Sequence, residues 1–232
     1  MFSGIGGFSL GLERAGMQTV AFCEPNKFCQ AVLLKHWPDV PIYEDVRDLS
    51  ATRLADDGIQ FDLICGGFPC QDISTAGKGA GLAGARSALW WEYWRLIKET
   101  TPSWVIAENV AALCYRGLDQ VLGSLAEIGY DAEWHCIPAS AVGAPHRRDR
   151  IWIVAYPNND GEPTCSVNAE TRRLSPFISN DGWPEWAHYP DAVRMDDGVP
   201  NRLDRLKALG NAVVPQIPEL IGKWIYEQSS YK

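Results

Sequence analysis

Short apolar runs alternate along the chain with longer segments in which apolar residues recur every three or four positions. The apolar runs have the length of strands and cover residues 18–23, 40–43, 61–65, 104–109, 131–137 and 150–156. The helical spacing occurs in residues 7–15, 27–36, 90–100 and 118–128, and again in a closing amphipathic segment at 215–227. This alternation predicts an α/β fold with a doubly wound, mostly parallel sheet.

The alternation stops at residue 157, and Pro, Asn, Asp, Gly and Trp dominate until about residue 200. We therefore expect a main domain over residues 1–156, a small irregular appendage over 157–200 and a return to the main domain over 201–232. The aromatic residues of "GWPEWAHYP" (182–190) could stack on nucleic-acid bases or pin the appendage to the core. Because no basic residues accompany them, we favour pinning.

The composition is that of a globular protein with one sizeable core: 232 residues, 46% of them hydrophobic and 22% charged. No apolar run is long enough to span a bilayer and the N-terminus lacks an export signal, so we expect a cytoplasmic protein without membrane contact. The seven cysteines are then expected to be reduced. The four histidines do not cluster, and we expect no metal site.

A net charge of −8 argues against indiscriminate binding of polyanions. Two segments nevertheless concentrate arginine, "PHRRDR" at 145–150 and "NRLDRLK" at 201–207. They could form a local basic face or could be ordinary solvated surfaces.

Cys70 stands in an unusual position in "DLICGGFPCQ". The apolar run ends in two glycines, and Pro69 then fixes φ so that the thiol is presented at the carboxyl end of a strand. Ligands bind at this edge of open α/β sheets. Free cysteines are also often buried structural residues, and this stretch alone leaves both interpretations open.

Carboxylates follow three other predicted strands. Glu24 and Asp45 come after the first two runs and a glycine-rich turn at 4–7, at a distance suited to accepting the hydroxyls of a ribose. Either acid could instead cap a helix or lie in a solvated loop. Glu108 ends the apolar run 104–109, where a carboxyl tends to have a raised pKa and can share a proton with a bound ring.

The segments "FSGIGGFSLGLERAG", "GGFPCQDIS", "ENV", "RRDRIWIVA" and "LGNAVVPQ" occur in an order that resembles the DNA cytosine-5 methyltransferases, especially the short bacterial and phage members. The resemblance extends from residue 2 to about residue 225. It implies a Rossmann-like, S-adenosylmethionine-dependent fold, with residues 157–200 as a reduced target-recognition region. It also implies double-stranded DNA as partner and a monomer that needs no other protein.

The resemblance implies a catalytic set of Cys70, Glu108, Arg150 and Arg148. Cys70 would add to carbon 6 of a cytosine flipped out of the duplex, Glu108 would bind ring nitrogen 3 and the exocyclic amine, and Arg150 would hold the base carbonyl. Residues 71–87 resemble a mobile loop that closes over the base, although they could also be an ordinary surface loop. The implied DNA contacts are Gln71, Ser74, Lys78, Arg86 and Arg147.

The cofactor contacts implied by the resemblance surround the glycine turn and the first two carboxylates. They are Phe2, Ser3, Gly4, Ile5, Gly6, Gly7, Glu24, Asp45, Val46, Pro69, Leu89, Asn211 and Val213. Phe2 would lie against the adenine, although it could also belong to the core.

The chain departs from the family at its start, because only Met1 precedes "FSG", where members carry several apolar residues that form the central strand. Either the start lies further upstream or the sheet lacks its middle strand and its stability is reduced. Pro25 and His146 also replace residues common in the family, an aromatic residue and a glutamine. Residues 196–210 occupy the place of the motif that scaffolds the recognition domain.

Three alternatives to a DNA methyltransferase remain. A tRNA cytosine methyltransferase would carry a "CFT"-like segment and a more basic surface, neither of which is visible. A binding protein without activity would not need Cys70, Glu108 and Arg150 together, but the absent strand and the short appendage keep this reading open. An unrelated dehydrogenase would leave the Pro-Cys turn unexplained.

Overall fold

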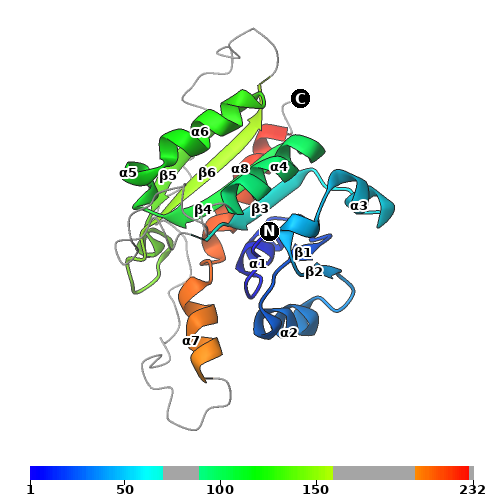
Figure 1. Cartoon of the computed structure of the whole chain (residues 1–232). Helices are drawn as coiled ribbons and strands as arrows, with labels where there is room; N and C mark the ends of the chain where they lie inside the picture. The colour runs from blue at the N-terminus through cyan, green and yellow to red at the C-terminus, as the bar shows by residue number, and fades with distance from the viewer. Residues whose placement is uncertain (70–88, 159–201, 230–232) are drawn as a thin grey trace.

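A computed structural model describes residues 1–69, 89–158 and 202–229 of the chain and confirms the α/β fold (Figure 1). The helices are α1 (Gly7–Arg14), α2 (Lys27–His36), α3 (Ala51–Asp56), α4 (Leu89–Thr100), α5 (Leu113–Arg116), α6 (Leu118–Glu127), α7 (Arg202–Asn211) and α8 (Gln216–Ser229). The strands are β1 (Phe22–Cys23), β2 (Ile42–Tyr43), β3 (Leu63–Gly67), β4 (Trp104–Val110), β5 (Tyr130–Ile137) and β6 (Arg150–Pro157). Two short 3-10 helices, η1 (Val46–Asp48) and η3 (Ala139–Val142), complete the described elements.

The strands form two sheets. A four-stranded sheet has the order β3-β4-β6-β5, and β1 pairs with β2 in a separate two-stranded sheet. The pairs β1–β2 and β3–β4 are parallel, whereas β6 is antiparallel to both of its neighbours. The sequence predicts a mostly parallel sheet; the pairs of the N-terminal half are parallel, and those of the C-terminal half are antiparallel. The connection between β5 and β6 contains the short η3 and no α-helix, which is typical of an antiparallel pair.

Helices cover both faces of the larger sheet, as the alternation of residues along β4 requires. Val105 and Ala107 pack toward α4 and α6, in a core that includes Trp90 and Leu125. Ile106 points to the other face, where the core is formed with α1 and α8. Figure 1 shows α4 and α6 on one side of the sheet and α1 beside α8 on the other. Both faces are thus buried, which explains why β4 and β6 are almost continuously apolar.

The first two strands are shorter than the sequence predicts. The apolar runs 18–23 and 40–43 are reduced to Phe22–Cys23 and Ile42–Tyr43. Among the described residues, β1 has a strand partner on one side alone, so less of its run is held in an extended ladder. In the part of the chain that the structure describes, no strand joins β1 to β3, and the two sheets are therefore separate.

None of the helices in the described part of the chain combines the length and the apolar character needed to cross a membrane.

Gly11 allows α1 to approach α8 closely. A Cβ atom at this position would collide with the carbonyl oxygen of Pro215 and would lie 2.9 Å from Cγ of Pro218. Gly123, in α6, is exposed and has open space where its Cβ would be. The contact between α1 and α8 therefore requires a glycine at position 11, whereas no contact requires one at position 123.

We predict that Gly11→Ala lowers the free energy of unfolding by about 1–3 kcal/mol, because the added methyl group separates α1 from α8. The matched change Gly123→Ala should raise it by about 0.4–1 kcal/mol, because alanine restricts the unfolded chain and fits the helix. Urea unfolding followed by circular dichroism measures both. Equal effects of the two substitutions would contradict this account of the helix contact.

Candidate active site

Glu108 lies near the carboxyl end of β4, opposite Trp152 of β6, and is 9% exposed. Nε of Arg150, the first residue of β6, lies 2.9 Å from Oε1 of Glu108. Burial raises the pKa of the Glu108 carboxyl, and the positive charges of Arg150 and Arg148 counteract only part of this effect. The site therefore holds a carboxyl that binds a proton more readily than an exposed glutamate does.

The glycines that end β3 make room for this carboxyl group. Gly67 pairs with Glu108 across the parallel ladder, and a Cβ atom at Gly67 would lie 2.7 Å from Oε2 of Glu108. Any larger residue would push the carboxylate away from the strand end. The Gly-Gly sequence before Pro69 thus serves the neighbouring strand as well as the turn.

Asn109 fixes the segment that leads from β3 to the cysteine turn. It is 2% exposed, and its Nδ2 donates a hydrogen bond of 3.1 Å to the carbonyl oxygen of Phe68. Its Oδ1 accepts from the amide of Val110. Asn109 is not among the site residues that the resemblance implies, although an amide in an apolar strand is a signal for such a contact. Pro69 is partly buried beside it.

Glu24 follows β1 and closes the glycine turn. The amide of Gly4 donates to Oε2 of Glu24 at 2.7 Å, and the amide of Asn26 donates to Oε1 at 2.9 Å. Gly4 and Gly6 have φ values of +53° and +87°, a region that favours glycine. The carboxylate is 7% exposed. Each of its oxygens accepts one amide and keeps a lone pair for another donor, as the binding of ribose hydroxyls requires.

The C-terminal segment between α7 and α8 closes on the same turn. A Cβ atom at Gly7 would lie 2.7 Å from the carbonyl oxygen of Val213, so the start of α1 touches this segment directly. The structure thus brings Val213 to the glycine turn. Asn211, at the end of α7, is exposed.

Arg148 holds this segment in place. Its guanidinium donates to the carbonyl oxygens of Gly210 at 2.7 Å and Ala212 at 2.8 Å. Burial, together with the neighbouring charge of Arg150, lowers the pKa of Arg148. The two arginines of "RDR" (148–150) therefore make different contacts, since Arg150 binds the carboxyl of Glu108 and Arg148 binds backbone carbonyls.

Asp45 caps η1 rather than standing free. Its Oδ1 accepts from the amide and from Nε of Arg47, each at 2.9 Å, and these hydrogen bonds hold the pKa of Asp45 below its usual value. The capping role considered for this acid is thus present. Val46 is buried in the core.

The remaining predicted residues are placed as follows. The ring of Phe2 packs edge-on against Tyr93, with 6.1 Å between ring centroids, and Leu89 is partly buried against the same core. Ser3 binds Cys23 through its amide and its hydroxyl, and Ile5 is partly buried. Arg147 is exposed. Cys70, Gln71, Ser74, Lys78 and Arg86 lie outside the described residues, as do residues 71–87 and nearly all of the appendage.

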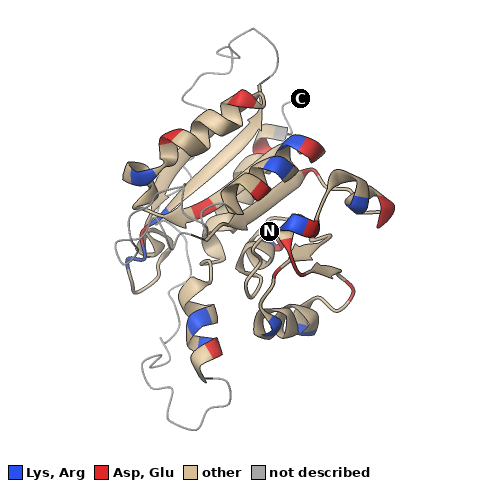
Figure 2. Ribbon diagram, viewed as in Figure 1, with Lys and Arg blue, Asp and Glu red and all other residues tan. Residues whose placement is uncertain are grey.

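Basic and acidic side chains are mixed over the described surface, and Figure 2 shows basic positions on α5, in the loop before β6 and on α7. Their arginines and lysine are Arg116, Arg147, Arg148, Arg205 and Lys207. In this view these elements lie toward the same side of the sheet. The arginine-rich segments noted in the sequence are thus not spread evenly over the molecule.

Comparison with known proteins gives a consistent result. The family model of C-5 cytosine-specific DNA methylases matches residues 1–181. Type II methyltransferase M2.BsuMI of Bacillus subtilis is 34% identical over 163 residues, which are 67% of this chain and 40% of that protein. Type II methyltransferase M.NgoBI of Neisseria gonorrhoeae is 31% identical over 185 residues, covering 78% of this chain and 57% of that protein. These matched regions therefore span about half the length of the two relatives.

Among solved structures, the Entamoeba histolytica methyltransferase EhMeth is similar over 98% of this chain and 97% of its own, with a TM-score of 0.69. The sequence identity is 12%, so this likeness concerns the fold alone.

We predict that Arg148→Ala releases the segment between α7 and α8. Because a hydrogen bond to a charged group contributes about 1.5–3 kcal/mol, the amides of residues 212–214 should exchange with solvent at least about tenfold faster. Hydrogen exchange followed by mass spectrometry measures this. Arg147→Ala, which changes an exposed neighbour, is the control and should leave the exchange unchanged. Unaltered exchange in Arg148→Ala would show that other contacts hold the segment.

We also predict a pH dependence that arises from Glu108. The carboxyl releases its proton at a lower pH in the unfolded chain than in the folded one, so stability falls as the pH rises from about 4 through the raised pKa. Glu108→Gln removes this dependence. As the pH rises, the free energy of unfolding of the variant should therefore increase relative to that of the unaltered chain, by about 1.4 kcal/mol for each unit by which the pKa of Glu108 in the folded chain exceeds that in the unfolded chain.

Urea unfolding of both proteins between about pH 4 and pH 8 measures this difference, with Glu127→Gln at the exposed end of α6 as the control. A constant difference across this range would contradict a raised pKa at Glu108.

Proposed function

Because the chain belongs to the C-5 cytosine-specific DNA methylase family, we propose that it transfers a methyl group from S-adenosylmethionine to carbon 5 of cytosine in double-stranded DNA. The observation that carries the proposal is the buried Glu108 carboxyl, held by Arg150 beside the strand that leads to Pro69 and Cys70. A proton-binding carboxyl near the end of one strand and a cysteine that follows the adjacent parallel strand in the sequence suit an addition to a pyrimidine ring.

Cys70 is proposed as the nucleophile. Carbon 5 of cytosine is too weak a nucleophile to take a methyl group directly, so a thiolate first adds to carbon 6 and makes the ring electron-rich. Both faces of a stacked base are covered, and the cytosine must therefore leave the duplex before Cys70 can reach it. Asn109, through its hydrogen bond to Phe68, would hold the turn from which the thiol approaches.

Glu108 is proposed as the acid that binds the ring. When protonated, it donates to ring nitrogen 3 as negative charge develops there during the addition, and its other oxygen accepts from the exocyclic amine. The raised pKa favours this protonation state. Arg150 orients the carboxyl and would bind the base carbonyl, while Arg148 supports the loop rather than the base.

The bound cofactor supplies an electrophilic methyl group. Once carbon 5 carries this methyl group and S-adenosylhomocysteine has been released, carbon 5 would give its proton to a water molecule. The electron pair of that C–H bond would restore the double bond between carbons 5 and 6, and the bond from carbon 6 to Cys70 would break to release the thiolate. Each proposed catalytic side chain ends the reaction with the covalent state and the charge with which it began, so the protein is regenerated.

The described residues fit S-adenosylmethionine at the glycine turn. Glu24 has acceptor capacity for ribose hydroxyls, the left-handed glycines Gly4 and Gly6 let a ligand approach the backbone, and Val213 closes the turn from the C-terminal segment. Phe2, Ser3, Ile5, Gly7, Asp45, Val46, Pro69, Leu89 and Asn211 complete the proposed cofactor set.

We also propose a set of residues that contact DNA. Gln71, Ser74, Lys78 and Arg86 would contact the flipped nucleotide and its phosphates, and exposed Arg147 would bind the backbone. The basic positions in Figure 2 supply local positive charge in a protein whose net charge is −8. We further propose residues 157–200 as the target-recognition region and a monomer as the active form.

We predict that the chain forms a covalent complex with duplex DNA in which 5-fluorocytosine replaces cytosine, in the presence of S-adenosylmethionine. Fluorine cannot leave carbon 5 as a proton does, so the reaction should stop with Cys70 still bound to carbon 6. Denaturing electrophoresis and mass spectrometry detect the complex. Cys70→Ser should form none, Glu108→Gln should form it about 10²–10⁴-fold more slowly, and the exposed-thiol control Cys136→Ser should react normally.

A complex that persists in Cys70→Ser would exclude the proposed nucleophile. Absence of a complex with the unaltered chain, together with retained binding of S-adenosylmethionine or DNA in calorimetry, would instead favour a binding protein without activity.

A further inference from the structure

Two cysteines outside the candidate active site are in contact through their sulfur atoms. Sγ of Cys114, in α5, lies 3.4 Å from Sγ of Cys136, in β5. Cys114 is partly buried, Cys136 is exposed, and both are free thiols. Because a disulfide bond is about 2.05 Å long, the two sulfur atoms must approach each other by about 1.4 Å to form one. Small rotations of the two side chains about their Cα–Cβ bonds supply a movement of this size.

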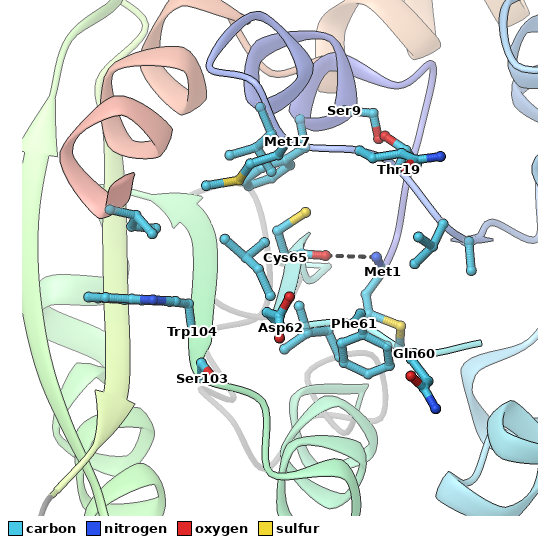
Figure 3. A pocket seen from close by; sticks show the side chains of 18 of the residues that line it. Met1, Ser9, Met17, Thr19, Gln60, Phe61, Asp62, Cys65, Ser103 and Trp104 are labelled. Carbon is cyan, nitrogen blue, oxygen red and sulfur yellow. Dashed lines mark hydrogen bonds between the residues drawn. The ribbon is translucent and has the colours of Figure 1, made fainter. Parts of the chain in front are cut away.

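The other cysteines in the described part of the chain have different surroundings. Cys23 and Cys29 are buried. Cys65 lines a cavity of about 980 Å³ that is bordered by residues of β1 and β3, and its carbonyl oxygen accepts a hydrogen bond of 2.7 Å from the terminal nitrogen of Met1 (Figure 3). Among the residues that the structure describes, contact between two cysteine sulfur atoms is therefore confined to the pair formed by α5 and β5.

The two thiols belong to segments that border the candidate active site. α5 begins three residues after the end of β4, the strand that carries Glu108. β5 is the edge strand of the four-stranded sheet, and its Ile137, the residue after Cys136, is paired with Arg150 of β6. A bond between the two sulfur atoms would therefore attach the chain that leaves the Glu108 strand to the strand beside Arg150.

α5 is a short helix that depends on its attachment to the rest of the chain. It has 4 residues, and no side chain caps its N-terminal end. Leu113 anchors it in the core, but the side chain of Tyr115 is 92% exposed. A helix of this length is marginal by itself, so it opens more readily than the core does. The exchange of its amides with solvent therefore reports whether a second attachment is present.

The surroundings of Cys136 favour the protonated thiol. Burial raises the pKa of Cys136 to about 11, and its contact with Cys114 and the negative charge of Asp149 act in the same direction. The thiolate is the form that attacks a disulfide. Because little of it is present near pH 7, the pair reacts slowly and responds to sustained exposure to an oxidant.

We propose that Cys114 and Cys136 form a reversible disulfide bond by exchange with a low-molecular-weight disulfide such as oxidised glutathione, and that this bond attaches α5 to β5. The Cys136 thiolate attacks one sulfur of glutathione disulfide and expels the other as a thiolate. The Cys114 thiolate then attacks Sγ of Cys136 and expels the second glutathione thiolate. The two cysteines are oxidised, glutathione disulfide is reduced to two thiols, and these take up the two cysteine protons. The pair is independent of the proposed methyl transfer.

The test is disulfide mapping of the full chain after prolonged incubation with oxidised glutathione. Free thiols are blocked by alkylation, and the unreduced protein is digested with trypsin, which cuts after Arg116 and so separates the two cysteines. Mass spectrometry should show peptide 99–116 joined to peptide 117–147 in at least about tenfold excess over any other pair of cysteines, because sulfur atoms in contact have a high effective concentration. Dithiothreitol should reverse the linkage.

Cys114→Ser is the control for pairing. Because this variant has no thiol beside Cys136, it should keep one glutathione on Cys136 as a mixed disulfide, which the unaltered chain resolves. A second control is the chain unfolded in urea. There the preference should disappear, because Cys23 and Cys29 are much closer in the sequence and close a shorter loop.

The linked chain should unfold at a temperature about 5–10 °C above that of the reduced chain, because the bond joins residues 22 positions apart and restricts the unfolded state. The amides of Tyr115 and Arg116 should exchange with solvent at least about tenfold more slowly. A mixed disulfide that persists on Cys136 of the unaltered chain, linkage to other cysteines in equal amount, or unchanged exchange at both amides of the linked chain would overturn the proposal.

Discussion

The burial of Glu108 against Arg150 is the interaction on which the candidate active site depends. A carboxyl that is 9% exposed must either pair with a positive charge or bind a proton, and this one is placed to do both. The position of the Glu108 carboxylate constrains the residues of the two neighbouring strands. Gly67 has no side chain because the carboxylate lies over it, and β6 begins with the arginine that contacts it.

The parallel pairing of β3 with β4 connects this ion pair to the rest of the site. It sets Gly67 beside Glu108, and the buried amide of Asn109 then binds the next residue of the β3 strand end. Arg148 ties the loop before β6 to the segment that carries Val213, and this segment touches the glycine turn at Gly7. The part of the site around Glu108 and the part around the glycine turn are therefore linked through backbone contacts. Methyl transfer requires such a fixed distance between cofactor and base.

Much of this arrangement could be predicted from the sequence. Periodicity located the six strands of the described residues and their longer helices except α7, because apolar runs and amphipathic spacing reflect burial directly. The placement of Glu24 and Glu108 followed from their positions after apolar runs. The two arginines could not be distinguished, because the partners of Arg148 are carbonyls of residues more than sixty positions away. Likewise, nothing in the sequence decides that Asp45 accepts hydrogen bonds from Arg47.

The chemical identity of the product tests the account most directly. Duplex DNA of mixed sequence is incubated with the protein and S-adenosylmethionine, digested to nucleosides and analysed by mass spectrometry against standards. Glu108 beside β3, the strand that precedes Cys70 in the sequence, predicts 5-methylcytosine as the methylated nucleoside. Methylation on the exocyclic nitrogen of cytosine or adenine, with no 5-methylcytosine, would contradict the account, because those reactions need neither a thiolate at carbon 6 nor an acid at ring nitrogen 3.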